Sequence, residues 1–191
     1  KRFMNKINKK HLFTYIKIRM NDPIFKVYTD GACINNGYPN AKCSIGIHFP
    51  KTNFIQLNDI SEFLDVKKSS NNVAELTAIK KSLEIIKENK IIAPINIYTD
   101  SMYSKNCIEK WYPNWVKKNI VHTKKNYKLI SEIFDIYSSL NEHNNIKLVY
   151  IKAHTGLQDE DSIGNEMADK LAVDALKKFP LKTMDIRKFF N

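Results

Sequence analysis

The chain has 191 residues, of which 43% are hydrophobic, and this content is enough to build the core of one domain. Lysine and arginine number 31 against 20 aspartates and glutamates, so the formal net charge is +11. The composition excludes a wholly disordered chain, and no apolar stretch approaches the ~20 residues that span a bilayer. The charge favours a polyanion such as nucleic acid or an acidic membrane surface as a partner.

The first segment, residues 1–22, is expected to be a basic extension or linker, because Lys1–Arg19 carries seven cations and no acid. It is compatible with the remnant of an organelle targeting peptide, with a linker and with a nucleic-acid-binding arm. The organised domain is expected over residues 23–180, and a tail over residues 181–191.

Three strands are predicted first, over Phe25–Thr29, Lys42–Phe49 and Asn53–Leu57, with Pro50 breaking the chain between the last two. Helices and strands then alternate. They are a helix over Asn72–Asn89, a strand over Ile95–Thr99, a helix over Ser101–Trp111 that Pro113 ends or kinks, a helix over Tyr127–Leu140, a strand over Ile146–Ile151 and a helix over Gly164–Phe179. This order predicts an α/β fold whose five-stranded mixed sheet, an antiparallel meander joined to parallel βαβ units, is flanked by helices.

Two of the predicted strands end in the same tripeptide, Tyr-Thr-Asp, which places Asp30 and Asp100 at strand ends. Ligand sites of open α/β sheets gather at the carboxyl ends of strands, so the two carboxylates are candidates for one site. Aspartate is also favoured in turns and at helix starts, which is the simpler explanation for each alone.

Three further polar residues admit two interpretations each. Glu75 is either the glutamate of a capping box that Asn72 opens, or a carboxylate directed towards the two aspartates. Asp169, inside the last predicted helix, is either an exposed helix acid or a site residue. His154, just after the fifth predicted strand, is either a surface-loop histidine or a site residue.

A second basic run, Lys105–Lys128, carries seven lysines against one acid. Aromatic residues lie among the lysines, including Trp111 and Trp115. Rings between cations suit a nucleic-acid groove, whereas the alternatives are a solvated face and a tryptophan that anchors a helix in the core.

The three cysteines, Cys33, Cys43 and Cys107, lie far apart in the sequence and form no CxxC pair. Their odd number favours a reducing, intracellular setting, and the choice among nucleus, mitochondrion and cytoplasm stays open. A monomer is the default expectation.

Five segments, taken together and in this order, resemble a type 1 ribonuclease H. They are Tyr28-Thr29-Asp30-Gly31-Ala32-Cys33, Asn71-Asn72-Val73-Ala74-Glu75-Leu76, Tyr98-Thr99-Asp100-Ser101-Met102-Tyr103, Tyr150-Ile151-Lys152-Ala153-His154-Thr155-Gly156 and Gly164-Asn165-Glu166-Met167-Ala168-Asp169-Lys170-Leu171-Ala172. The residues after the Asp-Ser pair and the long segment after His154 look like eukaryotic or large-virus versions of the family.

The resemblance implies an endonuclease that cuts the RNA strand of RNA–DNA hybrids and leaves 5′-phosphate and 3′-hydroxyl ends. Asp30, Glu75, Asp100 and Asp169 would bind two Mg²⁺ ions, with Mn²⁺ as a possible substitute. His154 would assist proton transfer or product release. The alternatives are a ribonuclease H domain of a reverse transcriptase and a hybrid-binding module without activity.

The same resemblance implies the substrate contacts. Residues near the minor groove or the RNA 2′-hydroxyls would be Cys33, Asn36, Asn71, Asn72 and Met102, and Asn165 is a further candidate substrate contact. The DNA strand would be contacted by Ser70, Tyr103, Trp111 and Trp115, and the backbone phosphates by Lys117 and Lys118. The chain departs from the family pattern in two places: Ile120 stands where a tryptophan is usual, and the segment 154–164 is long and acidic.

Overall fold

The computed structural model describes residues 23–65 and 70–178. The extension expected over 1–22 and the tail expected over 181–191 lie outside these residues. Among the described residues, no helix is both long enough and apolar enough to cross a membrane.

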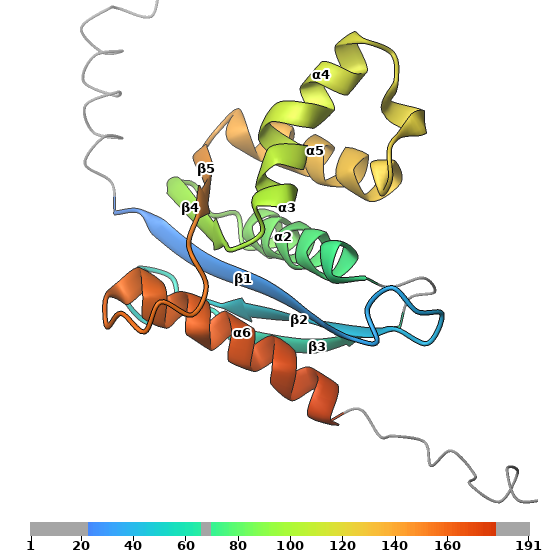
Figure 1. The fold of residues 1–191 in the computed structure, drawn as a ribbon. Helices are drawn as coiled ribbons and strands as arrows, with labels where there is room; N and C mark the ends of the chain where they lie inside the picture. Colours follow the sequence, from blue (N-terminus) through green and yellow to red (C-terminus); the bar gives the residue numbers. More distant parts are fainter. Residues whose placement is uncertain (1–22, 66–69, 179–191) are drawn as a thin grey trace, which may run out of the picture.

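A five-stranded mixed sheet forms the centre of the fold, in the strand order β3-β2-β1-β4-β5 (Figure 1). The strands are β1 (Phe25–Ile34), β2 (Lys42–His48), β3 (Ile60–Leu64), β4 (Pro94–Thr99) and β5 (Asn145–Tyr150). β1 pairs antiparallel with β2, and β2 with β3, whereas β4 is parallel to both β1 and β5. The predicted combination of an antiparallel meander and parallel crossovers is confirmed.

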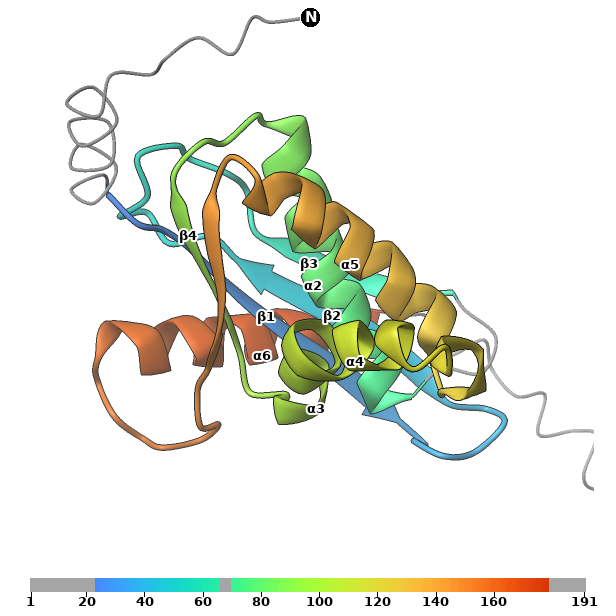
Figure 2. The same ribbon diagram turned by 90° about the horizontal axis from the view of Figure 1, so that it is seen from above.

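Helices cover both faces of the sheet. They are α2 (Asn71–Glu88), α3 (Met102–Asn106), the π-helical turn η1 (Cys107–Trp111), α4 (Tyr112–Lys117), the 3-10 turn η2 (Val121–Thr123), α5 (Tyr127–Asn141) and α6 (Glu160–Lys178). α6 packs against β1, β2 and β3 on one face, and α2 packs on the other with α5 beside it (Figures 1 and 2). The main core lies between the sheet and α2, where Leu76, Ile79, Leu83 and Ile86 are fully buried. This is the apolar face that the sequence predicts for the helix.

The third strand was predicted in the wrong place. It lies at Ile60–Leu64, and the predicted segment Asn53–Leu57 is a loop in the structure. The Asn53 side chain explains the difference, because it pairs with both backbone groups of Lys26: its Oδ1 accepts from the amide at 2.9 Å and its Nδ2 donates to the carbonyl at 2.8 Å. These bonds hold the segment Asn53–Leu57 against the start of β1, so it does not pair with β2 as a strand.

Two helix boundaries also differ from the prediction. The helix that was expected to end or kink at Pro113 continues into α4, and the π-helical turn η1 directly precedes it. The wider turn adjusts the backbone where proline has no N–H to donate. The last helix begins at Glu160 rather than Gly164, because the Asp159 carboxylate accepts from the Ser162 amide at 2.9 Å and from its hydroxyl at 2.8 Å.

Candidate active site

Three carboxylates meet where the parallel part of the sheet ends. The parallel pairing of β1 with β4 ends at Thr29 and Thr99, and the residues that directly follow these two threonines are Asp30 and Asp100. Asp100 ends its strand as predicted, whereas Asp30 does not, because β1 continues to Ile34 along β2.

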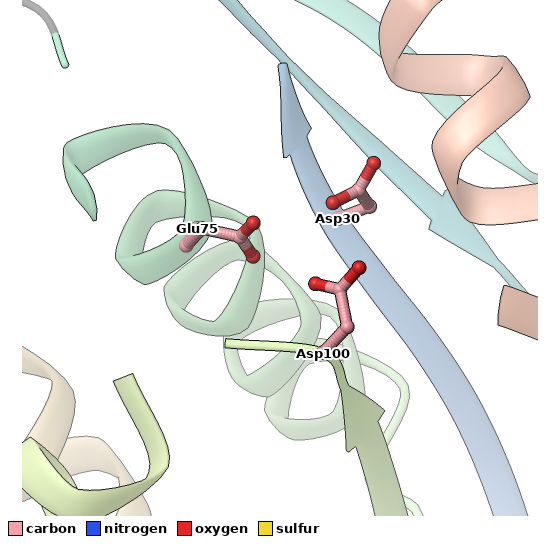
Figure 3. Close-up of side chains that lie close together, drawn as sticks. All are labelled: Asp30, Glu75 and Asp100. Carbon is pink, nitrogen blue, oxygen red and sulfur yellow. The ribbon is translucent and has the colours of Figure 1, made fainter. Parts of the chain in front are cut away.

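Glu75 reaches the two aspartates from the first turns of α2. One oxygen from each of Asp30, Glu75 and Asp100 lies within 4.8 Å of the other two, and Figure 3 shows the three side chains directed towards one another. The capping-box interpretation of Glu75 is therefore wrong. Ser70, not Asn72, is the N-cap of α2, and its hydroxyl accepts from the Val73 amide at 3.4 Å.

Burial and mutual repulsion raise the pKa of each of these acids. Burial is the largest cause throughout; with the charge of Asp100 it raises the pKa of Asp30 from 3.8 to about 7. Glu75, buried beside Asp30, has its pKa raised well above the ordinary value. Burial also raises the pKa of Asp100, and hydrogen bonds from its own backbone amide and from the Asn165 side chain oppose this rise because they favour the charged form.

These residues fit a divalent cation. They offer only oxygen ligands, which Mg²⁺ prefers, and they repel one another until a cation neutralises them. One buried oxygen of Glu75, Oε2, has no hydrogen-bond partner among the described residues, which is the state of an atom that awaits a ligand.

α6 brings two more predicted residues to the cluster. Asp169 is not one of the three mutually close acids, but it lies near enough to raise the pKa of both Asp30 and Asp100 by its charge. Asn165 is 3% exposed and donates to Asp100, and its Oδ1 has no partner among the described residues. The helix therefore adds a fourth carboxylate and an amide close to the three acids.

His154 lies on the loop between β5 and α6, with an exposed side chain and a left-handed backbone at φ 51°. Its charge lowers the pKa of Asp100, so the imidazole lies within electrostatic reach of the carboxylates. The acids expected in an extended loop after it do not lie at the cluster. Glu160 and Asp161 start α6 and bond to Lys26 instead.

The turn after β1 and the start of α2 are joined by a hydrogen bond, since Asn36 Oδ1 accepts from the Asn71 amide at 3.1 Å. Asn71 is exposed and Asn72 is half-buried beside it. Met102, 44% exposed, opens α3 after the Asp100-Ser101 pair. The candidate minor-groove residues are thus exposed or half-buried at the ends of elements that also carry the acids.

Cys33 does not offer a free thiol. It forms a disulfide with Cys43, its direct neighbour across β1 and β2, although the sequence spacing suggested unpaired cysteines. The pairing depends on register: the antiparallel alignment of β1 and β2 places the two cysteines, which are ten residues apart in sequence, opposite each other. Cys107 is free and buried.

A pocket of about 360 Å³ lies beside Ser70, between the β1–β2 turn and the start of α5. Of its lining residues, Lys125 belongs to the predicted basic run, whereas sequence reasoning missed Asn126. The available signal was the asparagine, which adopts a left-handed conformation at φ 60° as the N-cap of α5, a conformation that asparagine tolerates better than most residues.

The predicted aromatic residues form one row along α3, η1 and α4. The rings of Tyr103 and Trp111 meet edge to face at 5.9 Å, and those of Trp111 and Trp115 at 6.2 Å. Lys124 places its ammonium 6.0 Å from the centre of the Trp115 ring. Trp111 is 38% exposed, so the row combines core packing with an accessible surface.

The lysines of this region serve different purposes. Lys117 and Lys118 are exposed at the end of α4, as a phosphate-binding role requires. Lys105 is turned inward and donates to Glu109 and to the Leu148 carbonyl. The basic run is therefore partly structural.

Comparison with known proteins identifies the family of this chain. The profile of the RNase H family matches residues 22–177. A "Probable ribonuclease H" of Acanthamoeba polyphaga mimivirus is 36% identical over 150 residues, which are 75% of this chain and 62% of that protein. A "Ribonuclease H" of Clostridium botulinum is 30% identical over 158 residues, which are 80% of this chain and 95% of that protein.

Among solved structures, the RNase H domain of prototype foamy virus superposes with a TM-score of 0.62 at 27% identity. The match covers 82% of this chain and 96% of that domain. The chain belongs to the ribonuclease H family, whose members cut the RNA strand of RNA–DNA hybrids. The large-virus resemblance agrees with the mimivirus relative.

Proposed function

We propose that this chain hydrolyses the RNA strand of RNA–DNA hybrids at the Asp30, Glu75 and Asp100 cluster, with Mg²⁺ as the preferred metal. The observation that carries the proposal is the meeting of three carboxylates with raised pKa values at the end of the parallel strands. Structural acids rarely gather in this way without a cation, because each charge makes the next more costly.

The four acids would hold two divalent ions, with Asp169 completing the set from α6. Such a pair supplies an ionised water at neutral pH and stabilises the charge on the departing 3′ oxygen. The protein fixes the ligands in advance: the Gly31 amide donates to both Asp30 and Glu75, and Asn165 orients Asp100. Fixed ligands of this kind lower the reorganisation that catalysis requires.

His154 would act beside the metal ligands rather than among them. From its exposed position on a loop the imidazole would approach the scissile phosphate and take or give a proton there. Its effect should therefore fall on turnover or product release and not on metal binding.

The substrate would lie across the surface that runs from the Asn36–Asn71 contact to the aromatic row. The side that faces the RNA strand and its 2′-hydroxyls would carry Asn36, Asn71, Asn72 and Met102, together with the disulfide-bonded Cys33. Tyr103, Trp111 and Trp115 would pack on the deoxyribose side, and Ser70 would bind a DNA phosphate together with Lys125 and Asn126. Lys117 and Lys118 would meet more distant phosphates.

A second candidate is the same activity within a longer polyprotein, as the ribonuclease H domain of a reverse transcriptase. The likeness to the foamy virus domain favours it. Both candidates predict the same chemistry at the same residues. A hybrid-binding module without activity is less well supported, since all four acids are present.

The experiment is cleavage of a labelled RNA–DNA hybrid with Mg²⁺ and with a chelator instead. It compares the wild type with Asp100→Asn and with Asp135→Asn, which removes an exposed carboxylate of α5. We expect metal-dependent cutting that Asp100→Asn reduces at least about 100-fold and that Asp135→Asn leaves unchanged. Cutting that survives the chelator, or that Asp100→Asn retains, would contradict the proposal.

A further inference from the structure

A polar network joins the start of α6 to β1, at the opposite end of the strand from the Cys33–Cys43 disulfide. Tyr28 donates its hydroxyl to Asp161 Oδ1 at 2.7 Å, and Lys26 donates to the same oxygen at 3.1 Å. Lys26 also donates to Glu160 Oε2 at 2.8 Å, and Glu160 Oε1 accepts from Thr52 at 3.1 Å. The first turn of the helix is thus bonded to β1 and to the loop after β2.

The ring of Tyr28 is the fixed point of this network. It is fully buried, stacks on Tyr98 with ring centres 4.6 Å apart, and lies under Gly164, where an added β-carbon would come within 2.5 Å of it. The Tyr28 hydroxyl is therefore a donor at a fixed place beside the Asp161 carboxylate.

On β1 and on α6 alike, the residues of the polar network lie on the same face as the residues of the candidate active site. Side chains alternate along a strand, so Tyr28 and Asp30 point to the same side of β1. Residues four apart share a face of a helix, so Asp161, Asn165 and Asp169 form one line along α6. A shift at Asp161 therefore moves the two residues that α6 contributes to the catalytic cluster.

We propose that Tyr28 and Asp161 are positioning residues, which set the register of α6 against β1 and thereby place Asn165 and Asp169 for metal binding. Glu160 and Asp161, in the acidic segment between His154 and Gly164, form the first turn of α6 and make these bonds. This inference rests on the proposed metal-dependent hydrolysis.

A purely stabilising role is the alternative, and the two roles differ in what they change. Loss of a stabilising contact lowers the melting temperature and leaves the Mg²⁺ requirement of the folded enzyme unchanged. Loss of positioning raises the Mg²⁺ concentration that gives half-maximal effect, while the rate at saturating Mg²⁺ recovers.

The variants are Tyr28→Phe, which keeps the stacked ring and removes only the hydroxyl, Asp161→Ala, and the double variant. The control is Glu166→Ala, which removes a carboxylate from the exposed side of the same helix. For each full-length protein, two curves are measured against Mg²⁺ concentration: the rise in melting temperature without nucleic acid, and the cleavage rate of an RNA–DNA hybrid.

We expect Tyr28→Phe and Asp161→Ala each to raise both Mg²⁺ midpoints about 3- to 10-fold, with near-normal rates at saturation. The double variant should match Asp161→Ala, because the two residues act through one hydrogen bond. Midpoints equal to that of Glu166→Ala would overturn the positioning role. A wild type that shows neither Mg²⁺ stabilisation nor cleavage would instead overturn the proposed function, and this inference with it.

Discussion

Gly31 packs so closely beneath the first turns of α2 that a β-carbon on it would overlap the backbone nitrogen of Glu75. The same glycine donates its amide to the carboxylates of Asp30 and Glu75. One residue without a side chain therefore allows a helix to approach the strand and joins two of the three central acids.

Gly31→Ala should damage stability and activity together. The added carbon meets backbone rather than a flexible side chain, so α2 must move away from β1, at about 1–3 kcal/mol of stability. Compared with the Gly37→Ala control, we expect Gly31→Ala to have a lower melting temperature and a lower cleavage rate at saturating Mg²⁺. Gly37→Ala, at a turn where an added β-carbon meets nothing within 4 Å, is the control for a general effect of losing a glycine, although its φ of 89° adds local strain.

Neutralising Asp30 should stabilise the metal-free protein while it abolishes cleavage. Its pKa is raised from 3.8 to about 7, so the folded state keeps a proton that the unfolded chain releases between these values. Stability therefore falls as the pH rises from about 4 to about 7, by at most about 4 kcal/mol for this group, and stays low above that range.

Unfolding by urea from pH 4 to pH 8, in the presence of a chelator, tests this sign. Asp30→Asn should be more stable than the wild type at pH 8 and nearly equal to it at pH 4. Saturating Mg²⁺ should remove the advantage by stabilising only the wild type. A variant that is less stable at pH 8 without metal would contradict the account.

The aromatic row should govern substrate binding rather than chemistry. Trp111→Ala removes the exposed ring between Tyr103 and Trp115, and the loss of one stacking contact is worth about 1–3 kcal/mol. We expect KM for the hybrid to rise roughly tenfold with kcat nearly unchanged. Phe54→Ala, which removes a 48% exposed ring that packs on Phe25, should leave KM at the wild-type value.

Glu109 should matter for stability, although it lies in the basic run. Its Oε1 accepts from the Leu148 amide at 3.2 Å, and Lys105 donates to the Leu148 carbonyl, so the two side chains pair both backbone groups of Leu148 on the edge strand β5. Glu109→Ala leaves a backbone donor without its acceptor and should lower the free energy of unfolding by about 1–3 kcal/mol. Glu109→Gln keeps an acceptor oxygen and should lose much less.

The fold class and the central acids were predictable because both depend on local pattern. Alternating helices and strands implied the mixed sheet, and the repeated Tyr-Thr-Asp marked the point where the parallel pairing of β1 and β4 ends. Glu75 was ambiguous from sequence, since a capping glutamate and a ligand occupy the same helical position. The side chain of Ser70 decides the matter by capping α2 itself.

The errors arose where a contact between distant residues decides the local structure. Asn53 bonds to Lys26, 27 residues away, and this turns an apolar segment into a loop. The Cys33–Cys43 pairing depends on strand register, which cysteine spacing does not reveal. Asp161 was expected in an acidic loop, because its hydrogen-bond partner, Tyr28, lies 133 residues earlier and nothing in the local sequence indicates the contact.

The most direct test of the central claim is strand-resolved cleavage. Three duplexes of one sequence, RNA–DNA, RNA–RNA and DNA–DNA, are labelled on each strand in turn and incubated with the wild-type protein and Mg²⁺. We predict cutting of the RNA strand of the hybrid alone, with 5′-phosphate and 3′-hydroxyl ends. Equal cutting of the RNA–RNA or DNA–DNA duplex, or hybrid binding with no cutting, would contradict it.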